Sequence, residues 1–225
     1  AVGLTYTGWT LSVGSGDLNN DGWPDLYIAN DFGPDEYYLN TGATEMSPRF
    51  RLIVDPRGHP GVGHDWWKGM NVDMGDVNND GYLDIYVTNI TTLEYLREGN
   101  MLWHNMGNGS FTDVASPAEA YDGGWGWAGK FLDYDNDGDL DIFTVNGFVS
   151  AGEGNYWYDL ATMATTPDLD ITDARHWPTM GDRSFSGYEP SRLFRNDGPV
   201  FVEVAAQEGI ADTRDGRGIA VADFD

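Results

Sequence analysis

Residues 76–84 read Asp76-Val77-Asn78-Asn79-Asp80-Gly81-Tyr82-Leu83-Asp84, and this acidic stretch decides the fold. The same pattern returns at 17–25 and 133–141, and residues 223–225 begin a fourth copy. Oxygen-bearing side chains occupy positions 1, 3, 5 and 9 of each complete copy, and glycine occupies position 6. This spacing is typical of a chain that wraps around a hard cation, because Ca²⁺ takes 6–8 oxygen ligands. The sequence therefore predicts three calcium loops and the start of a fourth.

In each loop we expect ligands from the side chains at positions 1, 3, 5 and 9 and from the backbone carbonyl at position 7. The predicted ligands are Asp17, Asn19, Asp21, Trp23 and Asp25 in the first loop, Asp76, Asn78, Asp80, Tyr82 and Asp84 in the second, Asp133, Asp135, Asp137, Asp139 and Asp141 in the third, and Asp223 and Asp225 in the fourth. Asp, Asn and Gly also mark ordinary turns. That alternative would explain a single loop, but it explains three loops in the same register less well. An EF-hand fits less well, because position 12 is Ile28, Val87 or Thr144 instead of glutamate.

The loops also reveal a repeated unit. Their first residues are 17, 76, 133 and 223, so the spacings are 59, 57 and 90 residues. A glycine-containing run precedes each loop, a β-branched run follows it, and two shorter apolar runs complete the unit. The predicted strands are 10–16, 26–30, 38–40 and 50–53, then 69–75, 85–89, 102–105 and 111–114, then 126–132, 142–146, 193–196 and 201–204, and finally 216–222. Four antiparallel strands per unit predict an all-β propeller whose blades carry a calcium loop between strands one and two.

We expect residues 1–225 to form one propeller segment of about three to four blades. Blade one covers about 8–60, blade two about 61–120, blade three about 121–210, and blade four begins at about 211. The third unit is longer because residues 147–190 are inserted between its second and third strands. This connection belongs at the end of the blade opposite the calcium loops, and a short helix is predicted over 159–164. The aromatic-rich insertion either carries a binding function or packs as a lid on the propeller.

The stretch from Gly75 to Val87 resembles the FG-GAP (VCBS-type) repeat of integrin-α-like β-propellers. Residues 192–196 and 216–223 are similar to bacterial proteins of the ASPIC/UnbV type, which are related to cartilage acidic protein. The resemblance covers nearly the whole chain and implies a calcium-bearing propeller of about seven blades. It implies little about activity. Because three or four units cannot close such a ring, we expect residues beyond 225 or a partner to complete it.

The chain has 225 residues, a formal net charge of −25 and no cysteine. Nine Trp, twelve Tyr and ten Phe make it too aromatic for a disordered acidic chain. Its charge argues against nucleic acid as a partner, because phosphate neutralisation requires Lys and Arg. Weak calcium sites need the high calcium found outside the cytoplasm. We therefore expect an exported bacterial protein of the periplasm, cell surface or extracellular space, without a transmembrane segment.

Three classes of function remain open. The first is a protein-interaction module, such as an adhesin or a subunit of a larger complex. The second is a glycan-binding propeller, because Trp and Tyr beside acidic groups suit sugars. The third is an enzyme, in which His59, His64 and Asp65 could bind a transition metal, although a plain loop histidine pair is the simpler interpretation. No nucleophile elbow, P-loop or dinucleotide motif occurs, so we expect a non-catalytic module that binds a protein partner.

Overall fold

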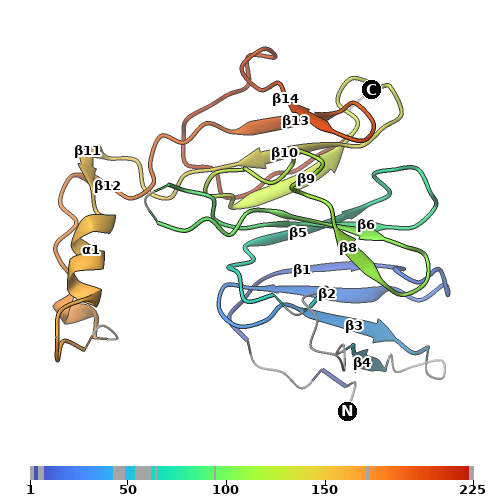
Figure 1. The fold of residues 1–225 in the computed structure, drawn as a ribbon, viewed down its shortest axis with the longest axis horizontal. Coiled ribbons are helices and arrows are strands. Elements are labelled where there is room, and N and C mark those ends of the chain that lie inside the picture. Colours follow the sequence, from blue (N-terminus) through green and yellow to red (C-terminus); the bar gives the residue numbers. More distant parts are fainter. Residues whose placement is uncertain are drawn as a thin grey trace.

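The computed structural model describes residues 3–4, 8–42, 49–53, 62–63, 65–93, 95–170 and 173–222. Within these ranges the chain forms three four-stranded antiparallel sheets that lie one beside the next (Figure 1). The strands are β1 (Thr10–Gly16), β2 (Asp25–Asn30), β3 (Glu36–Asn40) and β4 (Phe50–Leu52) in sheet one, β5 (Asn71–Gly75), β6 (Asp84–Thr88), β7 (Met101–Asn105) and β8 (Phe111–Asp113) in sheet two, and β9 (Ala128–Leu132), β10 (Asp141–Val145), β13 (Arg192–Asn196) and β14 (Phe201–Glu203) in sheet three. The predicted all-β fold with propeller-like, four-stranded sheets is confirmed.

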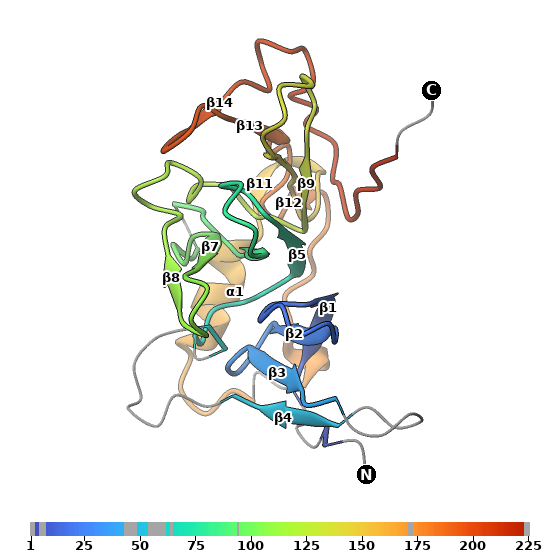
Figure 2. The ribbon, with the colours of Figure 1, turned by 90° about the vertical axis from the view of Figure 1, so that its right-hand side faces the viewer.

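Strands β1, β5 and β9 contact one another from sheet to sheet. In Figure 2 they lie along one side of the sheets, and the outer strands β4, β8 and β14 lie away from them. A Cβ atom added at Gly75 would lie 2.7 Å from Leu140 Cδ1 and 2.9 Å from Phe131 Cδ2. The Asp73 carboxylate crosses the same seam and accepts from Phe131 N at 2.9 Å and from Lys130 Nζ at 2.5 Å. Glycine therefore permits close packing of the inner strands, as the sequence predicts.

Apolar side chains fill the space between neighbouring sheets. The cluster between sheets one and two contains Leu18, Tyr27, Ala29, Tyr37, Val72, Ile85, Val87, Met101 and Trp103. The cluster between sheets two and three contains Val77, Tyr86, Leu102, Ala115, Ala118, Ala120, Phe131, Ile142, Phe194 and Phe201. Strand β6 lies between these clusters and is buried at every position. Coverage on both faces explains why the run after residues 76–84 is apolar instead of alternating.

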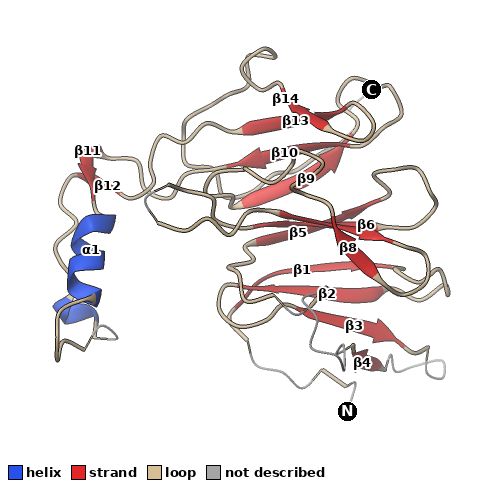
Figure 3. Cartoon of the chain, in the orientation of Figure 1, coloured by secondary structure: helices blue, strands red, loops and turns tan. Residues whose placement is uncertain are grey.

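The connection between β10 and β13 holds β11 (Gly152–Asn155), α1 (Trp157–Ala164), a 3₁₀ turn (Ala174–His176) and β12 (Arg183–Ser184). It lies at the end of the sheets opposite the acidic loops, and its helix lies to one side of the sheets (Figures 1 and 3). The helix predicted over 159–164 is confirmed and begins two residues earlier. Asn155 fixes this start, because its Oδ1 accepts from Trp157 N at 2.9 Å. No described helix combines the length and apolar character needed to cross a bilayer.

The strand predicted over 216–222 is wrong, because the described residues after β14 contain no strand. Gly216 N instead donates to Asn146 O at 3.1 Å. The Arg217 guanidinium lies over Trp127, 4.7 Å from the ring centroid. A first strand needs the second strand of its own hairpin as a partner, and that strand would follow the loop that starts at 223. Residues 223–225 lie outside the described part of the chain.

Candidate metal centre

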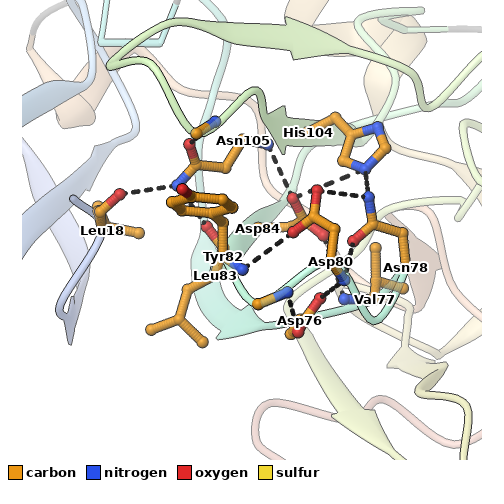
Figure 4. A network of polar contacts seen from close by, with 12 residues as sticks. Leu18, Asp76, Val77, Asn78, Asp80, Tyr82, Leu83, Asp84, His104 and Asn105 are labelled. Atoms are coloured by element: carbon orange, nitrogen blue, oxygen red, sulfur yellow. Dashed lines mark hydrogen bonds and ion pairs between the residues drawn. The ribbon is translucent and has the colours of Figure 1, made fainter. Parts of the chain in front are cut away.

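The three acidic loops have the same internal hydrogen bonds; we call residues 17–25 loop 1, residues 76–84 loop 2 and residues 133–141 loop 3. In loop 2, Asp76 Oδ1 accepts from Asp80 N at 3.0 Å and Asp76 Oδ2 accepts from Gly81 N at 2.8 Å (Figure 4). Asp80 Oδ1 accepts from Tyr82 N at 2.9 Å. The equivalent bonds recur in loop 1 and in loop 3. The first and fifth side chains therefore hold the turn with their carboxylates inside the loop.

Two positions in each loop have left-handed backbone. The fourth residue is always asparagine, with φ of 56° at Asn20, 58° at Asn79 and 59° at Asn136. The sixth is always glycine, with φ between 88° and 94° at 22, 81 and 138. Asparagine tolerates this region better than other side chains do, and glycine does so without a steric cost. The backbone thus requires the Asn and Gly that the sequence supplies three times.

The ninth residue of each loop is a buried aspartate. Asp84 is fully buried, and its Oδ2 accepts from Val77 N at 3.1 Å while its Oδ1 accepts from Asn105 N at 2.8 Å. Asp25 and Asp141 make the same pair of bonds to their own loops and to the last residues of β3 and β13. This carboxylate therefore joins the acidic loop to the third strand of its sheet.

Burial raises the pKa of the Asp84 carboxyl to about 6, although the hydrogen bonds from Asn105 and Val77 oppose the rise. Burial also raises the pKa values of Asp25 and Asp141. A buried carboxylate beside further carboxylates is costly without a positive charge. The donor set consists of oxygens, which hard cations prefer. The loops therefore fit a bound cation both by chemistry and by their unfavourable local charge.

The structure brings some predicted ligands together directly. Carboxylate oxygens of Asp133, Asp135 and Asp141 lie within 4.8 Å of one another and could hold a metal ion. In loop 2 the amide nitrogen of Asn78 lies 2.9 Å from Asp80 Oδ2, and loop 1 has the same contact. The predicted carbonyl ligands at Trp23, Tyr82 and Asp139 stay predictions.

The remaining predicted site residues fall outside the described chain. They are Asp223 and Asp225 of the fourth loop and His59 and His64 of the alternative metal site. Asp65, the third member of that alternative, is described and half-buried. Its Oδ1 accepts from Trp67 N at 3.3 Å, and burial raises its pKa to about 6.

Asparagine side chains link loop 1 to sheet two and loop 2 to sheet three. Asn105 Nδ2 donates to Leu18 O at 2.8 Å, and Asn196 Nδ2 donates to Val77 O at 3.0 Å. Position 4 adds a second set of links, from Asn20 Nδ2 to Gly81 O at 3.0 Å and from Asn79 Nδ2 to Asp139 Oδ1 at 2.7 Å. These bonds join the three loops in a continuous band across the sheets.

The sequence did not predict this band or a histidine beside loop 2. The signal for the band is the asparagine that ends the third strand of each sheet, at Asn40, Asn105 and Asn196. The histidine is His104 on β7, whose Nε2 contacts the amide of Asn78 and lies 4.0 Å from Asp84 Oδ1 (Figure 4). Nothing in the spacing of the acidic residues points to His104, because it lies 20 residues after the loop.

The opposite end of the sheets carries an aromatic cluster. Its rings belong to Tyr95, Trp125, Trp127, Phe148, Tyr156, Trp157 and Phe185. Tyr95 stacks on Trp125 with 5.2 Å between centroids, and Phe148 stacks on Trp125 with 5.1 Å. This cluster packs the insertion against sheets two and three. Beside it is a pocket of about 640 Å³ lined by Thr92, residues 151–155 and 184, and residues 186–189.

The family model for the FG-GAP-like repeat matches residues 17–87 and 91–144. These ranges contain loops 1, 2 and 3 and all or most of each strand from β2 to β10. The chain belongs to the FG-GAP-like repeat family. The resemblance drawn from the loop sequence is thereby confirmed.

The FG-GAP-like chain is also similar to cartilage acidic protein 1 of Mus musculus. The two are 31% identical over 142 residues, which is 60% of this chain and 21% of the mouse protein. This chain thus spans about a fifth of that relative's length. The similarity agrees with the predicted relation to cartilage acidic protein-like sequences.

Proposed function

We propose that this FG-GAP-like chain is a non-catalytic, calcium-stabilised module that binds a protein partner outside the cytoplasm, in an exported protein of the adhesin or assembly-subunit type. The observation that carries the proposal is the buried ninth aspartate of each loop. It connects the candidate cation ligands to a third strand, and the asparagine on that strand connects to the preceding sheet. A cation bound in the loop would therefore stabilise the contact between sheets as well as the loop.

Calcium suits these loops better than an ion that requires a stricter coordination geometry. The predicted donors are carboxylates, side-chain amides and carbonyls, and Ca²⁺ accepts such sets in flexible geometry. Extracellular calcium modules work with dissociation constants of about 10⁻⁴–10⁻³ M, which match the calcium concentration outside cells. The chain has no cysteine, so it lacks the disulfides that often stabilise secreted domains. Bound calcium would supply that stability instead, which supports export in a bacterium.

The insertion offers the best surface for a protein partner. The aromatic cluster holds its base, and Tyr158, Trp177 and Tyr188 are each at least half exposed. Helix α1 fully buries only Met163, and its residues Tyr158, Thr162 and Ala164 are exposed. Exposed Trp and Tyr at the end of a rigid scaffold are typical of interaction surfaces.

The test is cross-linking of the calcium-loaded native protein to its partner, followed by identification of the linked peptides. We expect the links to concentrate in residues 150–190. Tyr158→Ala and Trp177→Ala should weaken the complex and leave the melting temperature unchanged. Val202→Ala, at an exposed position of β14, is the matched control. Links confined to the sheets, with full binding by both aromatic variants, would refute this surface.

The second candidate is a glycan ligand, and the pocket beside the insertion favours it. Thr92, Ser184, Ser186 and Asn155 supply hydroxyl and amide groups, and Tyr188 supplies a half-exposed ring. A glycan array probed with the wild type and with Glu153→Ala tests this candidate, because Glu153 is exposed and lines the same pocket. Binding to defined sugars that the variant loses would favour the glycan. An array without any signal would remove it.

A further inference from the structure

The three loops differ at one neighbouring position on the third strand. The residue before the terminal asparagine is Leu39 in sheet one, His104 in sheet two and Arg195 in sheet three. Arg195 is engaged elsewhere, because its Nε donates to Asp197 Oδ1 at 2.7 Å. The imidazole of His104 instead points into loop 2 (Figure 4). Loop 2 alone among the described loops therefore combines oxygen donors with a ring nitrogen from this position.

The orientation of the His104 ring suits metal coordination. Its Nε2 contacts the amide nitrogen of Asn78, so this ring nitrogen faces the loop. An amide nitrogen can only donate, so this contact requires the tautomer with a lone pair on Nε2, and a bound ion would take the place of the amide. The same nitrogen lies 4.0 Å from Asp84 Oδ1. Ligand atoms lie about 2.0–2.2 Å from a first-row ion, so two ligands of one tetrahedral ion are about 3.3–3.6 Å apart, slightly closer than these two atoms. His104 and Asp84 can thus bind one ion with little movement.

An ion could also reach this position. A cavity of about 510 Å³ opens between sheets two and three, and Asn78 and His104 line it. The His104 side chain remains 28% exposed. The cavity gives a path for the ion and space for water ligands, which a metal site requires.

We propose that loop 2 and His104 form a mixed nitrogen and oxygen site that prefers a first-row transition ion such as Zn²⁺ or Mn²⁺ and takes calcium when no such ion is present, whereas loops 1 and 3 take calcium alone. Imidazole favours such ions over calcium, which prefers oxygen ligands alone. The inference rests on the proposed cation binding by the loops and adds a choice of ion at one of them.

Pulsed electron paramagnetic resonance of the full chain, in calcium with one equivalent of Mn²⁺, tests the site. We expect a ¹⁴N coupling from a directly bound imidazole in the wild type and none in His104→Leu, which carries the residue found at Leu39. The double variant His59→Gln, His64→Gln is the matched control and should keep the coupling. Zn²⁺ titration in saturating calcium should show at least tenfold weaker binding by His104→Leu.

Two results would overturn the inference: no nitrogen coupling in the wild type, or a coupling that survives in His104→Leu. His104→Gln repeats the test with a polar residue, and thermal melting of both variants verifies their folding. A separate calcium titration distinguishes this failure from failure of the proposed function. Calcium binding with no nitrogen coupling removes only the transition-ion site, whereas no calcium binding at any loop removes the proposed function as well.

Discussion

The side-chain amide of Asn105 donates to the backbone carbonyl of Leu18, 2.8 Å away, although the two residues lie 87 positions apart and in different sheets. Leu18 is the second residue of loop 1. Asn105 donates a bond to this loop and accepts none from it. The loop of one sheet is thus held by the third strand of the next. The contact is buried on both sides, so its loss leaves a backbone carbonyl without water.

The first prediction uses this contact. Asn105→Ala should destabilise the protein more than Asn40→Ala, by roughly 0.5–1.5 kcal/mol, because only Asn105 reaches another sheet. Both amides donate within their own sheet and accept from a following glycine, so Asn40 is a matched control. Urea unfolding in excess calcium measures the difference. Equal losses for the two variants would show that the bond between the sheets contributes nothing.

Removal of calcium should lower the melting temperature. With a dissociation constant of ~0.1 mM and ~1 mM free calcium, each site would add roughly 1.4 kcal/mol, or about 4 kcal/mol for three sites. For a chain of this size that corresponds to a shift of roughly 10 °C. Calorimetry with chelator, and again after calcium is restored, measures it. The same melting curve in both conditions, with no metal by elemental analysis, would contradict calcium stabilisation.

Two aspartates of loop 2 should differ in how they respond to chelation. Asp84→Ala should cost about 2–4 kcal/mol even in chelator, because Val77 N and Asn105 N lose a buried acceptor. Asp80→Ala should cost at most about 1.4 kcal/mol, and only in calcium, since Asp80 is exposed and acts mainly through the ion. Unfolding of both variants in the two conditions separates these roles. An Asp80→Ala loss that persists undiminished in chelator would contradict the assignment.

The buried carboxyl of Asp35 predicts a pH dependence away from the loops. It accepts from Asn30 N at 2.7 Å and Tyr27 OH at 2.8 Å. Burial is the main cause that raises its pKa well above the usual range, and the charges of Asp65 and Glu36 add to the rise. A raised carboxyl pKa favours the protonated group in the folded state. Its contribution is therefore fully present below the unfolded pKa of about 3.9 and is lost as pH rises through the folded value.

Asp35→Asn should therefore stabilise the protein at pH 7, by roughly 1–3 kcal/mol, and the gain should shrink towards pH 4. Asn100 supports this change, because it occupies the equivalent place in sheet two and donates to Tyr86 OH at 2.7 Å. Asn100→Asp is the reciprocal control and should destabilise more at pH 7 than at pH 4. Chemical unfolding across this range provides the measurement. A pH-independent effect of Asp35→Asn would show that Asp35 is ionised throughout.

Much of the fold could be predicted from the sequence because its decisive features are local. Gly81 and the acids around it specify a turn within nine residues, and the apolar run from Ile85 follows directly. The contacts that bring His104 and Asn105 to the loops are not local, since they depend on which strands lie side by side. The strand predicted at 216–222 failed for a related reason, because glycine and apolar residues cannot form a strand without a partner.

The hydrogen bonds that join the loops also affect when the folded protein reaches its full stability. Asn79 bonds directly to Asp139 of the following loop, so occupancy of one loop bears on the geometry of the next. A newly made chain in a compartment poor in calcium would lack the contribution of all three loops together. Under the proposed calcium binding and export, its sheets would reach full stability only where calcium is plentiful, so maturation of the fold would follow transport instead of preceding it.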